Sequence, residues 1–270
     1  MKSFKQYSKD IAPFFHIPKG SNSAPAAALI YNVRQLDVPV RDQDTNMYTE
    51  QEYKYHQWTD QTDNEDEYKL PSKLHKAQGT HDYSPYATTP DYEALNSYTR
   101  NSGSTNRKLF QAHVSGRPTE HGSFVKQMDS ALDKHKLKHD MHVYSGVQFD
   151  PEVVASHHEH RHVHLPAYTS TSLKKDVAAS FAGETRPFDG EYSHHHILHF
   201  HLKKGQKGAY VGMNHEGDRN NQLSEHPHEH EYIIPRNTRI HIGEKPTVYN
   251  DDMDNKKYHV WDAHVVDHHD

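Results

Sequence analysis

The chain has 270 residues, 33% of them hydrophobic and 25% charged, and its formal net charge is -6 with histidine counted as neutral. This length suits one or two domains, but the low hydrophobic content indicates that part of the chain does not pack into a core. The negative charge argues against general electrostatic binding of nucleic acid, and the absence of cysteine excludes disulfides, zinc–thiolate sites and cysteine nucleophiles.

The first part of the chain reads as a polar arm. Residues 1–90 alternate short apolar pieces with polar and acidic stretches such as residues 60–68, which predicts a poorly packed arm or targeting region. The first fifteen residues lack the apolar segment of a secretory signal, so secretion by a signal peptide is not expected. No stretch approaches the roughly 18 apolar residues of a membrane span, so no membrane partner is expected either.

The middle of the chain predicts helices and then a strand. Apolar residues near helical spacing predict a helix that begins at Asp91 and ends at Gly103, a plausible C-cap. A second amphipathic helix is predicted over residues 124–137, followed by a strand over 141–149. A short extended piece then leads into a further helix, for which Ser172 is the predicted N-cap.

The last part of the chain predicts strands. Short segments rich in β-branched and aromatic residues are separated by Gly, Pro, Asn and Lys, over residues 194–202, 207–213, 229–235, 238–243 and 258–266. Helices first and antiparallel strands later predict an α+β domain over residues 91–270.

Three short polar pieces occur in order along these extended segments. They are Tyr144-Ser145-Gly146, Ser170-Thr171-Ser172 and Glu229-His230-Glu231. Together they resemble the ADP-ribosyltransferase exoenzyme family, whose pattern is an aromatic-Arg pair, an S-T-S strand and an E-x-E or Q-x-E pair. The resemblance covers about residues 91–266 and implies two small, mostly antiparallel sheets that form an NAD cleft, preceded by helices.

The resemblance implies an NAD-dependent mono-ADP-ribosyltransferase with a host protein as acceptor, most often arginine for an E-x-E member. A carboxylate at Glu231 would stabilise the oxocarbenium-like centre that forms as the bond to nicotinamide breaks. Glu229, two residues earlier on one extended segment, would point to the same side and deprotonate the incoming guanidinium. Ser170 would bond the catalytic glutamate or the nicotinamide ribose.

The remaining residues of the three pieces are assigned to NAD binding. The candidate cofactor-binding residues are Tyr144, Ser145, Gly146, Ser170, Thr171, Ser172 and Phe181. Thr171 would also brace the strand. Phe181 and Tyr144 suit a core or sheet position equally well, because aromatic side chains are common there.

One position departs from the family pattern. Ser145 stands where the family has the arginine that binds the NAD phosphates through its planar fork. Arg107, Arg117 and Arg161 are candidates to replace it. If none does, the alternative is a catalytically degenerate virion or interaction protein with the same fold.

The 28 histidines create chance metal motifs. Residues 158–162 match H-E-x-x-H, but no third ligand follows at a characteristic spacing, so no metal centre is predicted there. Adventitious zinc or nickel binding by this tract, by residues 194–196 or by residues 226–230 remains open, as does a His-rich metal-binding protein. The alternation over residues 199–201 is typical of a half-exposed strand.

The opening MKSFKQYSKDI is a basic amphipathic patch. A plain N-terminal helix is the simplest interpretation. The patch is also similar to short sequences that target internal proteins into heads of tailed bacteriophages, which would imply packaging in a virion and action in the host cytoplasm.

Overall fold

The computed structural model describes residues 50–64, 69–78, 89–116, 122–182, 184–185, 193–213, 223–251 and 254–266. The predicted targeting patch of residues 1–11 and the candidate Arg117 lie outside these ranges. Among the described helices, none combines the length and the apolar character of a transmembrane span.

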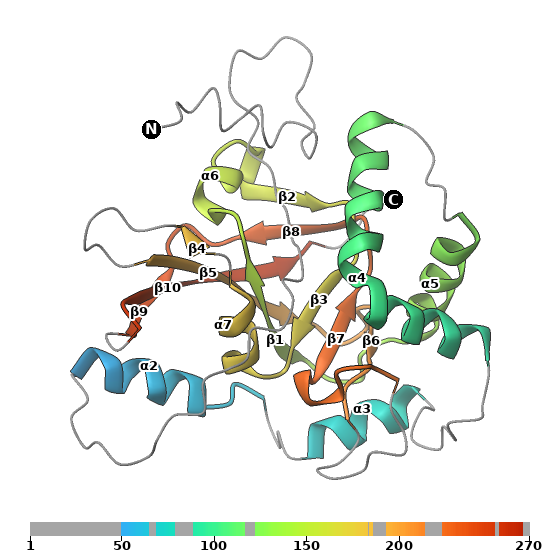
Figure 1. Ribbon diagram of the computed structural model, residues 1–270, viewed down its shortest axis with the longest axis horizontal. Coiled ribbons are helices and arrows are strands. Elements are labelled where there is room, and N and C mark those ends of the chain that lie inside the picture. The colour runs from blue at the N-terminus through green and yellow to red at the C-terminus, as the bar shows by residue number, and fades with distance from the viewer. Residues whose placement is uncertain are drawn as a thin grey trace.

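The α+β class is confirmed, with helices at the start and strands later (Figure 1). The α-helices are α2 (Glu50–Asp60), α3 (Leu70–Gln78), α4 (Pro90–Ser115), α5 (Gly122–Lys134), α6 (Pro151–Ala155) and α7 (Lys175–Phe181), and the 3₁₀ turns are η3 (Glu159–Arg161) and η4 (Pro227–Glu229). The strands are β1 (Met141–Val147), β2 (His162–Leu165), β3 (Thr169–Ser172), β4 (Glu184–Thr185), β5 (Ser193–Leu202), β6 (Ala209–Tyr210), β7 (Glu231–Ile234), β8 (Thr238–Ile242), β9 (Thr247–Asp251) and β10 (Lys256–Val265).

The described strands form one hydrogen-bonded path in the order β2-β8-β10-β5-β1-β3-β7-β6, with β4 on β5 and β9 on β10. Neighbours are antiparallel, except that β10 runs parallel to β5. The two expected sheets are therefore joined, and the joint is narrow, because β1 and β3 share the single partner pair Tyr144 and Ser172. Predicted site residues lie on both sides of this joint.

The helices α4 and α5 cover the end of the sheet formed by β3, β7 and β6 (Figure 1). The predicted stripe of α5 is confirmed, since Val125, Met128 and Leu132 are buried. The prediction that α4 ends at Gly103 is wrong. The helix continues past a distortion at Asn101 to Gly116, whose φ of 64° ends it. Burial of apolar side chains beyond residue 103 outweighs the roughly 1 kcal/mol that a helical glycine costs.

Two helices from the segment expected to be a poorly packed arm lie against the sheet. Tyr55 and Trp58 of α2 are buried and stack on Tyr258 and Tyr249, with ring centroids 4.8 Å apart in both pairs. Leu74 of α3 joins the main core. A few large side chains thus anchor helices whose average composition is polar. The boundary at residue 90 stays a prediction, but poor packing does not hold for α2 and α3.

Helix α7 lies very close to β1, and a glycine makes this approach feasible. A Cβ on Gly146 would clash with the backbone of Ala178 in α7 and of Ala182, which follows the helix. The glycine therefore brings the wall formed by α7 onto the strand that carries Tyr144.

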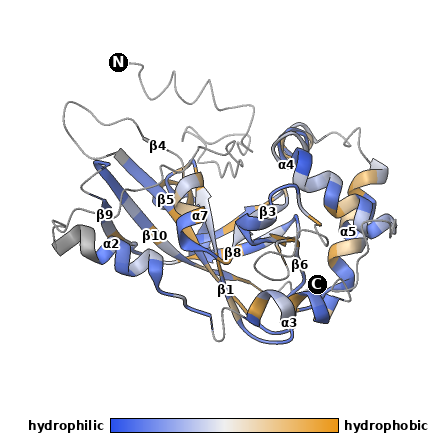
Figure 2. Ribbon diagram, turned by 60° about the horizontal axis from the view of Figure 1, so that its bottom comes forward, coloured by the Kyte–Doolittle hydropathy of each residue, from blue (hydrophilic) through white to orange (hydrophobic). Residues whose placement is uncertain are grey.

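The histidine tract over residues 158–162 is not an α-helix. It contains η3, with His160 at a φ of 53°, and β2 begins at His162. The H-E-x-x-H zinc motif requires both histidines on one helical face, so this conformation does not provide it. Figure 2 shows hydrophilic colour along much of β10, where lysine and histidine residues are interspersed with buried core residues.

Candidate active site

A pocket of about 360 Å³ lies where β1, β3, β7 and α7 meet. It is lined by Tyr144, Ser145, Gly146, Ser170, Thr171, Ser172, Val177, Ala178, Phe181, Glu229 and Glu231. The structure thus brings every predicted site residue to one pocket, although these residues come from segments far apart in the chain. Their chemical roles stay predictions.

Glu231 begins β7 and pairs with Ser172 across the β3–β7 ladder. Its side chain is 6% exposed, and its Oε1 has no hydrogen-bond partner among the described residues. Burial raises the pKa of Glu231 to about 7, and a hydrogen bond with Ser170 lowers it in part. A buried carboxylate with one oxygen unpaired is poised to interact with a cation or a sugar hydroxyl that enters the pocket.

Glu229 also lines the pocket, but by a different route from the one expected. It lies in η4, and His230 between the two glutamates has a φ of 49°. The predicted extended segment is therefore wrong, and the alternation of a strand does not apply. A turn brings the two carboxyl groups to one pocket instead. Burial and the neighbouring charge of Glu231 raise the pKa of Glu229 to about 7.

Ser170 is held by a residue that the sequence did not single out. The hydroxyl groups of Tyr98 and Ser170 are 3.1 Å apart, and Asn106 Nδ2 donates to the Tyr98 hydroxyl at 2.9 Å. Tyr98 is fully buried in α4. In the sequence it is one apolar position of a helical stripe, and no signal distinguishes it from a core tyrosine.

The other two residues of the S-T-S strand hold the backbone around the glutamates. Thr171 Oγ1 donates to the Tyr232 carbonyl oxygen at 2.6 Å. Ser172 Oγ donates to the Glu229 carbonyl oxygen at 2.6 Å and accepts from the amide of Lys174 at 2.9 Å. Ser172 is therefore not the N-cap of α7, a position that Lys174 occupies. It ties the Glu229 turn to the start of α7.

The missing arginine is not supplied by the candidates that the structure describes. Ser145 is 4% exposed, and its hydroxyl donates to the Ser170 carbonyl oxygen at 3.0 Å. The guanidinium of Arg161 binds Glu152 at 2.8 Å and backbone carbonyls, away from the pocket. Arg107 lies on α4, and it is not among the described residues that line the pocket.

Two lysines lie beside the glutamate pocket. Lys174 and Lys175 line a second pocket of about 990 Å³, which shares Tyr144 and Val177 with the first. Lys175 is 4% exposed, its Nζ is 3.1 Å from Asp63 Oδ2, and it lies 5.5 Å from the centre of the Tyr144 ring. The Tyr144 hydroxyl also donates to Asp63. This end of the site therefore holds a buried lysine that is paired with Asp63.

Comparisons with known proteins agree with this geometry. The chain is 28% identical over 122 residues to the NAD(+)--arginine ADP-ribosyltransferase EFV of Enterococcus faecalis, a match covering 44% of this chain and 21% of that protein. Its fold is similar to C3stau2 from S. aureus with NAD, at 22% identity and a TM-score of 0.52, covering 77% of this chain and 98% of that one. It is also similar to Plx2a, an ADP-ribosyltransferase toxin from Paenibacillus larvae, at 19% identity and a TM-score of 0.52, covering 80% and 96%.

The aligned part of the chain spans about a fifth of the curated Enterococcus relative. The family itself is decided by a broader match, because the sequence pattern of the ADP-ribosyltransferase exoenzymes extends over residues 52–268. That range includes all but the first two residues of α2, the whole of α3 and all the pocket residues. The chain belongs to the ADP-ribosyltransferase exoenzyme family.

Proposed function

We propose that this protein is an NAD-dependent mono-ADP-ribosyltransferase that modifies a protein side chain, with arginine as the acceptor. The observation that carries the proposal is the pair Glu229 and Glu231, which line one pocket with both pKa values raised to about 7. Perturbed carboxyl groups in a concave site are typical of catalytic positions.

The residues of the pocket fit NAD as substrate. The unpaired Oε1 of Glu231 offers an acceptor, and Val177, Ala178 and Phe181 provide an apolar wall suited to a flat ring. The lysines of the adjoining pocket offer charge for the phosphates. When bound, NAD supplies the nicotinamide leaving group and the ADP-ribose to be transferred.

Glu231 would act as a fixed negative charge. Its ionised form stabilises positive charge that develops at a sugar carbon, and such a contact is strong because burial removes competing water. Ser170, itself held by Tyr98, orients the carboxylate through the hydrogen bond between them. The mechanism thus requires the ionised form of a group that burial disfavours.

Glu229 would act on the acceptor. A pKa of about 7 suits a general base that works near neutral pH. A guanidinium is protonated at this pH and needs both an anionic partner and proton removal before it can attack. The arginine proposal is supported by this carboxylate pair and by the name of the Enterococcus relative.

Lys174 is our candidate to replace the missing phosphate-binding arginine, with Lys175 behind it. Lys174→Ala is expected to raise KM for NAD by roughly 10- to 100-fold, since each charge-assisted hydrogen bond contributes about 1.5–3 kcal/mol. Lys207→Ala, which removes an exposed lysine paired with Asp133, is the matched control. An unchanged KM in Lys174→Ala would contradict the replacement.

The serine at position 145 supports one alternative function, which is that of a virion or interaction protein without catalytic activity. The Ser145 hydroxyl donates its hydrogen bond to the Ser170 carbonyl oxygen, and the side chain carries no charge with which to bind a phosphate. Both properties are expected of an interaction protein that keeps the fold without catalysis. The experiment that separates the two is incubation of the purified protein with labelled NAD and either a cell extract or agmatine, a small guanidinium acceptor. We expect labelled bands and labelled agmatine, both lost in Glu231→Gln. Absence of label with both acceptors, and of NAD hydrolysis, would support the alternative.

We also propose that the protein acts in a host cytoplasm after packaging in a phage virion. This proposal is supported only by the similarity of residues 1–11, which lie outside the described ranges.

A further inference from the structure

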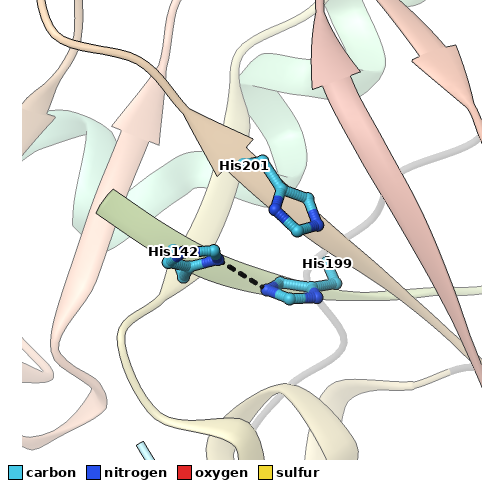
Figure 3. A group of neighbouring side chains, drawn as sticks. All are labelled: His142, His199 and His201. Carbon is cyan, nitrogen blue, oxygen red and sulfur yellow. Dashed lines mark hydrogen bonds between the residues drawn. The ribbon is translucent and has the colours of Figure 1, made fainter. Parts of the chain in front are cut away.

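Three histidines gather on one face of the sheet, on strands that neighbour each other only in the fold. His201 of β5 lies directly opposite His142 of β1, and His199 lies two residues along β5 on the same face. One ring nitrogen of each residue can be chosen so that all three lie within 4.8 Å of one another. Figure 3 shows the three rings facing a common space.

The spacing suits a metal ion. His142 Nδ1 and His199 Nε2 are 3.0 Å apart. Two nitrogens that bind one tetrahedral zinc ion at 2.0–2.1 Å lie about 3.3–3.4 Å from each other. A few tenths of an ångström of movement at each ring would therefore convert this pair into two ligands.

Asp262 of β10 lies within hydrogen-bonding distance of two of these rings, those of His199 and His201. Its Oδ1 is 3.2 Å from His199 Nδ1 and 2.8 Å from His201 Nε2. A carboxylate accepts hydrogen bonds, so each of these nitrogens carries a proton. The lone pairs then lie on His199 Nε2 and His201 Nδ1. A carboxylate behind a ligating histidine is the usual arrangement around protein-bound zinc, where it fixes the tautomer and raises the basicity of the ligand.

Histidine binds a metal ion as the neutral imidazole, and a further acidic side chain, Asp63, adjoins the cluster. Asp63 Oδ2 is 3.6 Å from His199 Nε2 but is also paired with Lys175.

His264, Lys203 and Tyr144 also surround the three histidines. His264 stacks on His201 with ring centroids 4.5 Å apart, and Lys203, whose Nζ is 2.8 Å from Asp140 Oδ2, is a neighbouring charged residue. The Tyr144 ring stacks on His199 at 4.7 Å and covers that side. The His201 and Asp262 side chains are 24% and 60% exposed, which leaves an entry path from solvent.

We propose that His142, His199 and His201 form a site for a divalent first-row transition ion, with Zn²⁺ as the chosen ligand and a fourth position left for water. The site is separate from the glutamate pocket and the proposal does not depend on transferase activity. Tyr144 is the residue that the two sites have in common: its ring stacks on His199, and it also lines the glutamate pocket.

The test is calorimetric titration of untagged, full-length protein with Zn²⁺. We expect one tight site per chain in the wild type. His142→Ala combined with His201→Ala should weaken it by about 100-fold or more, beyond the roughly 10- to 100-fold that outer carboxylate partners contribute. The matched control combines His194→Ala with His259→Ala, a pair whose Nδ1 and Nε2 are also 3.0 Å apart, and it should keep the tight site.

A second variant keeps the proposal testable if the double variant does not fold. Asp262→Asn removes the carboxylate without removing a ligand and should weaken Zn²⁺ binding by about 10- to 100-fold. With Co²⁺ as a spectroscopic probe, the wild type should show the intense visible absorption of a four-coordinate site. Several weak sites in the wild type, equal losses in the test and control pairs, or no effect of Asp262→Asn would each overturn the proposal.

Discussion

Replacement of Glu231 by glutamine is expected to stabilise the folded protein at alkaline pH while it abolishes NAD cleavage. Glutamine keeps the shape of the side chain and removes its charge. Glu231 is 6% exposed, and burial raises the pKa of its carboxyl group to about 7 from an ordinary value of 4.5. At pH 8.5 Glu231 is therefore ionised in the folded wild-type protein, although burial favours its neutral, protonated form.

The sign and size follow from proton linkage. Between pH 4.5 and 7 the folded state holds a proton at Glu231 that the unfolded chain has released, so the free energy of unfolding falls as pH rises through this window. One pKa unit corresponds to about 1.4 kcal/mol, which gives a loss of roughly 3 kcal/mol at pH 8.5. Glu231→Gln avoids this loss and also removes the charge that raises the pKa of Glu229, which acts in the same direction.

The assay is urea unfolding of wild type and Glu231→Gln at pH 5 and pH 8.5, followed by circular dichroism. We expect nearly equal free energies of unfolding at pH 5 and a variant more stable by roughly 3 kcal/mol at pH 8.5. The same preparations should show loss of NAD hydrolysis in the variant. A stability difference that is the same at both pH values would refute the reasoning, because it would show that charge at Glu231 is not what the fold resists.

Three further predictions follow from the same contacts. The kcat/KM for NAD hydrolysis should rise with pH through about 7 and fall away below it, because Glu231 must be ionised; a flat profile from pH 5.5 to 8.5 would contradict this. Glu229→Gln should lose transfer to agmatine but keep slow NAD hydrolysis, and equal loss of both activities would remove the division of roles. Trp58→Ala should lower the free energy of unfolding by roughly 3–5 kcal/mol in urea titrations, because it removes a buried side chain. The control Val153→Ala, at a residue that is 44% exposed, should lower it by about 0.5 kcal/mol or less. Similar values for the two variants would show that α2 contributes little to stability.

The pocket was predictable because many of its polar residues lie in short motifs on core strands. Ser170 and Glu231 belong to segments whose composition already indicates strands, and their order along the chain matches a family pattern. The pairing of β3 with β7 then brings these segments together. The helices α4 and α5 were predictable for a similar reason, since their apolar positions repeat at helical spacing.

The errors share a different cause, which is tertiary contact overriding local preference. Glycine at 103 lowers helix propensity, yet buried side chains on both sides of it continue the helix. The segment before residue 90 is polar on average, but a few large apolar residues such as Trp58 decide whether it packs. Average composition does not reveal these few residues. The turn at Glu229 depends on a left-handed residue, His230, that is not a glycine.

The histidine cluster shows where sequence spacing stops being informative about metal sites. Motif searches find ligands that are close along the chain, and here they point to residues 158–162, where the conformation does not suit a metal. His142 and His199 are 57 residues apart, and their nitrogens meet because β1 and β5 pair in the register that sets His142 opposite His201. A shift of that register by one residue would place the histidines of the two strands on opposite faces and separate the ligands. The candidate ligand set is therefore a property of strand pairing, and in a chain with 28 histidines only the fold distinguishes it from chance.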